Sequence, residues 1–333
     1  MRRVKLGIIG VGEIGTVHAT NIVRDVPGAE LAAVADLQVE KARECARSLG
    51  VTKFYGRMEE LLADRDVEAV LICTTPESHA QILIAAAAAG KSIFCEKPLG
   101  LEPVEAQKAL DRVEAAGVLL QVGFNRRFDA NFRRIKEQLD AGKLGTPHSV
   151  HIISRDPEPP GKEYYLLSGG ILLDMTIHDF DLARHLIGDE VVEVYVAGST
   201  LIAPWLAEHG DADTLAIILK FSRGAVGIIS NSCKAVFGYD QRVEVFGERG
   251  MVSASNPLPD TTDFMGENGH CTPPLLHFFT ERYRASYAEE IRSFVDSVAN
   301  GKEPVVTGRD GLIGIQIATA ARQSLRTGAP VRL

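Results

Sequence analysis

Short apolar runs alternate with helix-like segments over residues 1–123, and this alternation constrains the fold more than any other feature. Each of the five apolar runs ends in turn or polar residues. Strands that alternate with helices form a parallel sheet covered on both faces, and right-handed crossovers make that sheet doubly wound. We therefore predict an α/β domain over residues 1–123. Its expected strands are 4–10, 30–36, 68–74, 91–97 and 117–123, and its expected helices are 13–24, 38–49, 77–89 and 102–116.

The segment GVGEIG places Gly10, Gly12 and Gly15 between the first strand and the first helix. In this spacing the first glycine allows a tight turn, the second lets the backbone approach a pyrophosphate, and the third lets the helix pack on the strand. Asp36 ends the second strand, 21 residues after Gly15, where a carboxylate can bind the hydroxyls of an adenosine ribose. A structural glycine-rich turn is the alternative, but the context favours a Rossmann domain that binds a dinucleotide.

Asp36 also bears on which dinucleotide binds. Its carboxylate would repel a 2′-phosphate, and the next residue is Leu37 rather than an Arg that could bind such a phosphate. We therefore expect NAD rather than NADP as the cofactor.

The pattern changes after residue 123. Consecutive β-rich runs joined by glycine-containing turns are typical of an open antiparallel sheet. We predict a second, α+β domain over residues 124–333 with a large open, mostly antiparallel sheet, and its helix 308–326 could pack back on the first domain. The expected strands are 148–155, 190–201, 213–221, 224–232, 241–246 and 250–255; the expected helices are 128–140, 169–187, 281–299 and 308–326; and 256–277 is expected to be an irregular loop.

The length and composition limit the class of protein. A chain of 333 residues is too long for one ordinary core, which agrees with two domains. The net charge of −8, without a basic block, argues against a nucleic-acid partner. The five cysteines and the histidines lack metal-ligand spacing, so we expect reduced thiols and no metal. Because we find neither a signal-peptide cleavage pattern nor an apolar run long enough to span a membrane, we expect a cytoplasmic protein.

An Asp and a His lie four residues apart in the apolar segment GGILLDMTIHDFD, residues 169–181. On a helix, Asp174 and His178 would share one face, with side-chain origins about 5–6 Å apart. A neutral imidazole is suited to accept a proton near pH 7, so a proton-handling site is one interpretation. A buried polar pair that satisfies itself is the other. Asp179 falls off this face and is expected to be solvated or to pack against the fold.

Longer motifs point to a known family. They are CTTPESHA (73–80), CEKPLG (95–100), GFNRRFD (123–129), SGGILLDMTIHDFD (168–181) and GYDQRVEVFG (238–247). Over essentially its whole length the chain resembles the glucose–fructose oxidoreductase / inositol dehydrogenase / rhizopine catabolism (GFO/IDH/MocA) family, and most closely its inositol dehydrogenases. The resemblance implies a homotetramer formed through the open sheet. It also implies NAD-dependent oxidation of a cyclitol ring hydroxyl to a ketone, with myo-inositol and its 2-keto product as the first expectation.

Three residues would then carry the reaction. His178 would take the hydroxyl proton, Lys97 would hold the reacting oxygen, and Asp174 would orient the imidazole or bind a neighbouring hydroxyl, while NAD accepts the hydride. Each domain would contribute part of the site. The expected cofactor contacts are Gly10, Gly12, Glu13, Ile14, Gly15, Asp36, Thr74, Thr75, Pro76, His79, Glu96 and Lys97; the expected substrate contacts are Lys97, Arg127, Asp156, Asp174, His178, Tyr239 and Tyr287.

Structural roles and other activities remain as alternatives. His79 could be structural at the start of a helix, and Asp156, Tyr239 and Tyr287 could be a turn acid and two packing tyrosines. The same chemistry could act on scyllo-inositol, chiro-inositol or an aldose, because a stereoisomer changes only which hydroxyl meets His178. An NAD-retaining glycosidase or a nucleotide-binding sensor is a further alternative.

Overall fold

A six-stranded parallel sheet forms in the first part of the chain, in the order β3-β2-β1-β4-β5-β6. The computed structural model describes residues 3–159, 161–267 and 269–333. The sheet extends outward in both directions from the β1–β4 pair, which confirms the predicted doubly wound fold. The elements are β1 (Val4–Ile9), α1 (Glu13–Arg24), β2 (Ala29–Ala35), α2 (Val39–Ser48), β3 (Lys53–Tyr55), α3 (Met58–Ala63), β4 (Ala69–Ile72), α4 (Pro76–Ala88), β5 (Ser92–Glu96), α5 (Pro103–Ala116), β6 (Leu120–Gly123) and the 3-10 helix η1 (Asn125–Phe128).

Two elements of this sheet region lie outside the expected pattern. Strand β3 has three residues and helix α3 has six, and both are too short to show a hydrophobic period in the sequence. The strand lies at the edge of the sheet and pairs only with β2.

A helix from the end of the chain completes the core around this sheet. In α11 (Arg284–Asn300), the side chains of Ile291, Phe294 and Val295 lie in the same buried cluster as Leu6 and Phe94. Residues of α1 and α2 belong to that cluster as well. The apolar face of α11 therefore serves the parallel sheet, although almost 200 residues separate it from β5.

Contacts divide the chain into two units. The first unit comprises the chain up to Phe128, with Leu167–Gly169 and Ala285–Gln316. The second comprises Asp129–Leu166, Gly170–Arg284 and Ile317–Leu333. This division differs from the expected domains 1–123 and 124–333 chiefly because α11 and the first part of α12 (Gly308–Thr327) belong to the first unit.

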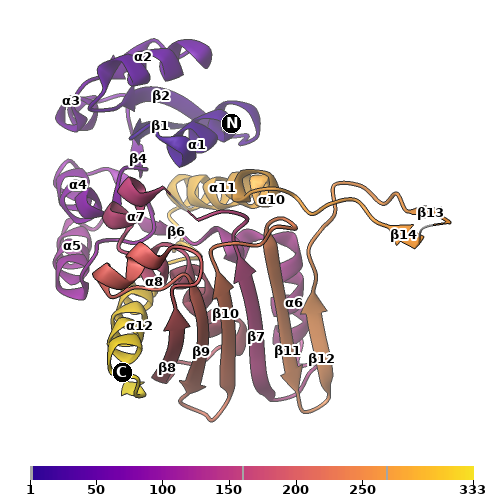
Figure 1. Ribbon diagram of the computed structural model, residues 1–333. Helices are drawn as coiled ribbons and strands as arrows, with labels where there is room; N and C mark the ends of the chain where they lie inside the picture. The colour runs from indigo at the N-terminus through magenta and orange to yellow at the C-terminus, as the bar shows by residue number, and fades with distance from the viewer. Residues whose placement is uncertain (1–2, 160, 268) are drawn as a thin grey trace. The chain divides into compact units, whose positions relative to one another are not determined.

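The second unit contains a seven-stranded sheet, most of whose strands lie side by side in Figure 1. Its order is β12-β11-β7-β10-β9-β8-β15, and only β7 and β10 run parallel, which confirms the predicted mostly antiparallel sheet. Its elements are α6 (Ala130–Asp140), β7 (Pro147–Arg155), α7 (Lys162–Ser168), α8 (Ile171–Asp174), α9 (Thr176–Ile187), β8 (Val191–Ser199), the 3-10 helix η2 (Pro204–His209), β9 (Thr214–Phe221), β10 (Val226–Ser232), β11 (Asp240–Gly247), β12 (Gly250–Ala254), β13 (Phe264–Gly266), β14 (Gly269–Cys271), α10 (Phe279–Arg282) and β15 (Val331–Arg332).

One face of this second sheet is open. Helices α6 and α9 pack on the opposite face. The strand register places exposed apolar side chains next to one another on the open face, with Ile228 opposite Ile218 and Phe246 opposite Met251. Val226 belongs to the same face. An amphipathic sheet with one uncovered apolar face therefore forms, as the alternating pattern of its strands indicates.

The expected irregular loop 256–277 contains a short hairpin, which corrects that prediction. Strands β13 and β14 pair antiparallel, and Figure 1 shows the hairpin extending away from β12. Phe264 and Met265 at this hairpin are mostly exposed. Three-residue strands give too little alternation for recognition in the sequence. Among the described residues, no helix is both long enough and apolar enough to cross a membrane.

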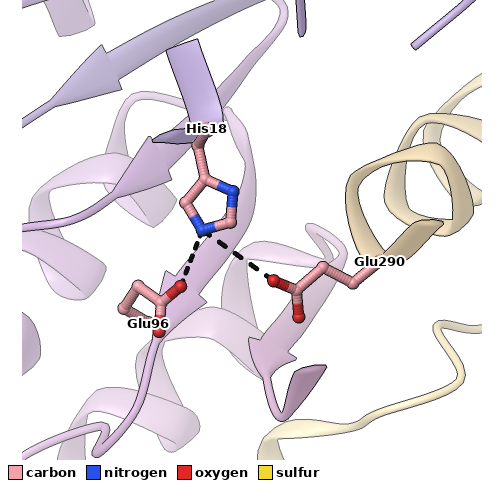
Figure 2. Close-up of side chains that lie close together, drawn as sticks. All are labelled: His18, Glu96 and Glu290. Atoms are coloured by element: carbon pink, nitrogen blue, oxygen red, sulfur yellow. Dashed lines mark hydrogen bonds and ion pairs between the residues drawn. The ribbon is translucent and has the colours of Figure 1, made fainter. Parts of the chain in front are cut away.

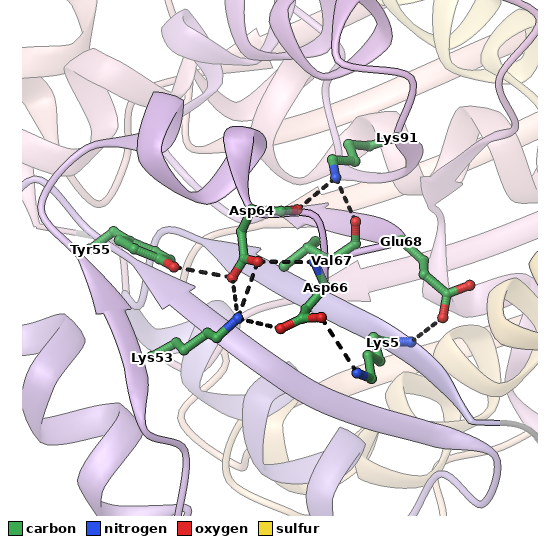
Figure 3. Close-up of polar contacts among 8 residues, drawn as sticks. All are labelled: Lys5, Lys53, Tyr55, Asp64, Asp66, Val67, Glu68 and Lys91. Carbon is green, nitrogen blue, oxygen red and sulfur yellow. Dashed lines mark hydrogen bonds and ion pairs between the residues drawn. The ribbon is translucent and has the colours of Figure 1, made fainter.

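A polar network stabilises the segment between α3 and β4 in the first unit (Figure 3). The Lys53 ammonium binds the carboxylates of Asp64 and Asp66, and Tyr55 donates to Asp64 as well. Lys91 donates to the backbone carbonyls of Asp64 and Val67. These hydrogen bonds raise the pKa of Lys53, with Asp66 as the largest cause, and connect the edge strand β3 to the loop before β5.

A buried aspartate closes the loop after β8 in the second unit. Asp213 is fully buried and accepts the backbone N–H groups of Leu201, Ile202 and Ala203 at 3.0, 2.8 and 2.7 Å. Burial alone would raise the pKa of this carboxyl, but these hydrogen bonds and one from Thr214 together lower it.

We expect Asp213→Asn to lower the free energy of unfolding by about 2–4 kcal/mol at pH 7, because an amide N–H replaces an acceptor that faces backbone donors. Since the folded-state pKa of Asp213 is depressed, its stabilisation is present above the unfolded pKa of about 3.9 and is lost as the pH falls through the folded value. Urea unfolding at pH 7 and pH 3 measures this difference. Asp140→Asn, at an exposed pair with Lys136, is the control and should change little; an equal loss at both pH values would contradict the role of the charge.

Candidate functional site

The glycine loop between β1 and α1 has the geometry of a phosphate-binding turn. Gly10 has a φ of +91°, and a Cβ on Gly15 would lie 2.1 Å from the Gly10 carbonyl oxygen. A Cβ on Gly12 would meet no atom within 4 Å. Helix α1 begins at the exposed Glu13 without a side-chain cap, while Ile14 packs on the core. The loop therefore leaves room for a pyrophosphate at the backbone N–H groups of the first helical turn.

Asp36 lies beside this loop at the end of β2. Its Oδ2 accepts the N–H of Val11 at 2.9 Å, and its Oδ1 accepts the N–H of Gln38 at 2.8 Å. Each carboxylate oxygen can accept further bonds, so the fixed carboxylate can also bind ribose hydroxyls. The neighbouring Leu37 is 92% exposed and offers no cation to a 2′-phosphate. These residues fit the adenosine end of NAD.

The loop after β4 is fastened to the loop after β5. Thr75 is the exposed residue before α4, and the buried Pro76 starts that helix. The His79 ring reaches the carbonyl oxygens of Pro98 at 2.6 Å and Thr74 at 3.0 Å. Burial lowers the pKa of His79 against the effect of the two carbonyls, so the ring is neutral at pH 7 and donates to one of them. His79 therefore connects two loops, and direct cofactor contact stays a prediction.

Lys97 directly follows β5 at the carboxyl edge of the parallel sheet, where doubly wound folds bind ligands. Its side chain is half-buried, and the Lys97–Pro98 peptide is cis. The preceding residue, Glu96, is buried and directs its carboxylate into the first unit instead. Successive residues of a strand point in opposite directions, so Lys97 and Glu96 are presented to different surroundings.

The Glu96 carboxylate meets a buried histidine and a second buried carboxyl group (Figure 2). His18 Nε2 lies 2.7 Å from Glu96 Oε1 and 3.8 Å from Glu290 Oε1. His18 and Glu290 are fully buried. In the part of the chain that the structure describes, these three residues form the cluster of potential metal ligands. The sequence pattern did not single out His18 or Glu290.

Two predicted substrate contacts have structural partners in the first unit. Arg127 forms an ion pair with Asp310 at 2.9 Å and donates to the Val305 carbonyl. The Tyr287 ring packs edge-on against His18 with their centroids 5.7 Å apart. Both are largely buried, and substrate contact by either stays a prediction.

A glycine and an aspartate set the start of the catalytic segment in the second unit. Gly170 has a φ of +82°, and a Cβ there would lie 1.9 Å from Asp211 Oδ2. That oxygen accepts the Tyr165 hydroxyl at 2.7 Å and the Ile171 N–H at 3.2 Å. The start of α8 is therefore fixed by hydrogen bonds to its first backbone donor.

Asp174 and His178 lie on two consecutive helices, which corrects the prediction of one uninterrupted helix. Helix α8 ends at Asp174, and α9 begins at Thr176. The Thr176 hydroxyl donates to the Ile171 carbonyl, and such side-chain bonding bends a helix. Both Asp174 and His178 are half-buried, and Tyr164, which the sequence pattern did not identify, donates its hydroxyl to Asp174 Oδ1 at 3.0 Å.

Asp179 is fully buried, so of its two expected settings the solvated one is wrong. It accepts Asn231 Nδ2 at 2.8 Å, while the Asn231 side-chain oxygen accepts the Thr176 hydroxyl at 2.9 Å. This chain of hydrogen bonds fastens the beginning of α9 to β10. Asp179 is therefore a packing residue, as the other expectation had it.

The remaining predicted contacts lie elsewhere in the second unit. Asp156 follows β7 and is half-buried, and its backbone bonds to Ser232 and Ala235. Tyr239 is buried between the rings of Phe278 and Tyr283. Both fit the structural alternative, and substrate contact by either stays a prediction.

Comparison with known proteins gives matches to two family models. Residues 4–124 match the oxidoreductase family with an NAD-binding Rossmann fold, and residues 132–253 match the GFO/IDH/MocA C-terminal domain. Curated relatives match over nearly their full length. A myo-inositol 2-dehydrogenase of Thermotoga maritima is 44% identical, with 99% of this chain and 98% of the relative covered. A scyllo-inositol 2-dehydrogenase (NAD(+)) of Bacillus subtilis is 37% identical, with 99% and 96% covered.

Solved structures share the fold over the whole chain. A probable dehydrogenase from Thermotoga maritima superimposes with a TM-score of 0.96 at 44% identity, covering 99% of this chain and 98% of that one. A scyllo-inositol dehydrogenase from Lactobacillus casei, with bound NAD(H) and scyllo-inositol, gives a TM-score of 0.93 at 29% identity, covering 99% of both chains. The glycine loop, the two sheets and these full-length matches agree, and the chain belongs to the GFO/IDH/MocA family of oxidoreductases with an NAD-binding Rossmann fold.

Proposed function

We propose that this protein is an NAD-dependent inositol 2-dehydrogenase that oxidises myo-inositol to its 2-keto product. The observation that carries the proposal is the 44% identity, over 99% of the chain, to a myo-inositol 2-dehydrogenase. Lys97 after β5 and the Asp174–His178 segment supply the groups that alcohol oxidation needs.

The chain's own residues divide the work of the reaction. Bound NAD supplies the hydride acceptor. His178 takes the proton of the reacting hydroxyl, since a neutral imidazole is an effective base near pH 7. Lys97 donates to the reacting oxygen and stabilises the negative charge that develops on it. Asp174, held by the Tyr164 hydroxyl, binds a neighbouring ring hydroxyl or orients the imidazole.

Oxidation of scyllo-inositol is the second candidate, because a relative with that activity in its name is 37% identical over 99% of this chain. The two substrates differ at one carbon and present the same chemistry to His178 and Lys97. A panel of cyclitols and aldoses, assayed with NAD and with NADP by absorbance of the reduced cofactor, separates them. Absence of NADH formation with every cyclitol would reject the proposal.

The proposal also includes assembly as a homotetramer through the open face of the second sheet. Ile218, Ile228 and Phe246 are partly exposed there on adjoining strands, and apolar patches of this kind mark association surfaces.

Asp36→Ala should weaken NAD binding and reduce discrimination against NADP. A hydrogen bond to a charged group contributes about 1.5–3 kcal/mol, so we expect NAD affinity to fall about tenfold or more. Titration with each cofactor measures the effect. Equal kcat/KM for NAD and NADP in the unmodified protein would contradict the assignment of Asp36.

Lys97→Met and His178→Ala should each lower kcat by about 10²–10⁴-fold, because both remove an interaction that grows in the transition state. NAD affinity should change far less. Lys108→Met on α5, an exposed lysine of the same unit as Lys97, is the control. A wild-type kcat in either variant would remove that residue from the reacting set.

Ile228→Glu should lower the molar mass measured by light scattering, because it places a charge in the centre of the open face. Since Ile228 is partly exposed, the variant should fold as before. Val104→Glu, at an exposed apolar residue of α5, is the matched control. An unchanged mass in Ile228→Glu would show that the tetramer, if formed, uses another surface.

A further inference from the structure

We propose that His18, Glu96 and Glu290 are positioning residues, which connect the helix after the glycine loop to the end of β5 and thereby fix Lys97. The three lie on three elements of the first unit, α1, β5 and α11 (Figure 2). The inference rests on the proposed role of Lys97. It adds a function to buried groups that neither the fold nor the reaction otherwise requires.

The cluster connects two functional segments. His18 lies one helical turn after Gly15, so it moves with the loop that binds the pyrophosphate. Its Nε2 is 2.7 Å from the carboxylate of Glu96, the residue immediately before Lys97. Glu96 Oε2 in turn lies over Gly123 of β6, where a Cβ would approach it to 2.9 Å. The Glu96 side chain is therefore confined from both sides, and the backbone that presents Lys97 is confined with it.

Distances in the cluster fit a shared hydrogen bond better than a metal ion. Two ligand atoms at about 2.0–2.2 Å from a tetrahedral zinc are roughly 3.3 Å or more apart. His18 Nε2 and Glu96 Oε1 are closer, at 2.7 Å, which is a hydrogen-bond distance. An imidazole N–H donated to a carboxylate accounts for this contact.

Glu290 completes the cluster as a neutral acid. It is fully buried, and neither of its carboxyl oxygens has a hydrogen-bond partner in the structure. Two carboxylates facing one imidazole would leave net negative charge in the interior, which is costly. Burial, and then the charge of Glu96, raise the pKa of Glu290 well above its usual range.

The other titratable groups around the cluster do not supply a cation. Burial is the largest cause that raises the pKa of the Cys73 and Cys95 thiols, and Glu96 adds to it. Both thiols are therefore neutral at pH 7. Tyr287 offers His18 the edge of its ring. The compensating proton is thus assigned to Glu290.

The first test separates cofactor binding from turnover. His18→Phe keeps ring packing against Phe94 and Tyr287 but removes the donor to Glu96. We expect kcat to fall about tenfold or more, since misplacement of a reacting group by 1 Å can cost about 100-fold. The dissociation constant of NAD should stay within about threefold. His18→Gln, whose amide can donate, should recover part of the loss.

Glu96→Gln and Glu290→Gln form a second pair of variants that keep the side-chain shape. Glu96→Gln should reduce kcat as His18→Phe does, whereas Glu290→Gln imitates a neutral acid and should keep kcat within about threefold. A carboxyl with a raised folded-state pKa loses stability as the pH rises above its unfolded pKa of about 4.3. Glu290→Gln should therefore melt at or above the wild-type temperature at pH 8. Glu289→Gln, at a surface pair with Arg292 on the same helix, is the control.

A readout without substrate keeps this proposal distinct from the proposed function. Lys97 is labelled with an amine-selective acylating reagent, and its rate is compared by mass spectrometry with that of the exposed Lys108. We expect the ratio to rise about twofold or more in His18→Phe and Glu96→Gln, because the amine is less confined. If no cyclitol is oxidised, the proposed function fails and the labelling ratio alone decides this proposal.

Three results would overturn the proposal. One is an unchanged labelling ratio in both variants. Another is a loss of NAD binding equal to the loss of kcat, which would indicate general damage to the nucleotide loop. The third is a stoichiometric divalent metal in the purified protein that disappears in His18→Phe, which would make the cluster a metal site.

Discussion

The contact between α1 and β1 is the constraint on which the first unit depends. Gly15 has no side chain, so the helix approaches the strand to a distance that the Gly10 carbonyl would deny to any Cβ. That approach sets the position of every later residue of α1. His18 consequently reaches Glu96, and the uncapped first turn of the helix opens beside Asp36. A single steric requirement thus places the phosphate end, the ribose end and the support of Lys97 together.

The parallel sheet and the glycine loop could be predicted from sequence because their signals are local. Apolar runs of β1, β2, β4, β5 and β6 and the helices between them are long enough to show their periods. The cluster of His18, Glu96 and Glu290 could not be predicted in this way, since Glu290 is almost 200 residues from Glu96 in the sequence. The apolar face of α11 signals a buried helix but carries no information about which sheet it covers.

The second unit shows the same limit at shorter range. The (i, i+4) spacing of Asp174 and His178 is visible in the sequence, and it correctly draws attention to the segment. The break at Met175 is not visible, because it depends on the Thr176 hydroxyl, which bonds to both Ile171 and Asn231 of β10. Burial of Asp179 has the same origin. A helical pattern gives the faces of a helix, while its interruptions are set by the neighbours it packs against.

Completion of the first unit by residues 285–316 has a consequence for synthesis of the chain. During translation the parallel strands emerge first, yet Ile291, Phe294 and Val295 leave the ribosome only near the end. Until then, the apolar surface around Leu6 and Phe94 lacks its final cover, and exposed surface of this kind promotes aggregation. The nucleotide-binding unit is therefore the first to begin folding and cannot be the first to finish, which makes the nascent chain dependent on rapid elongation or on chaperones.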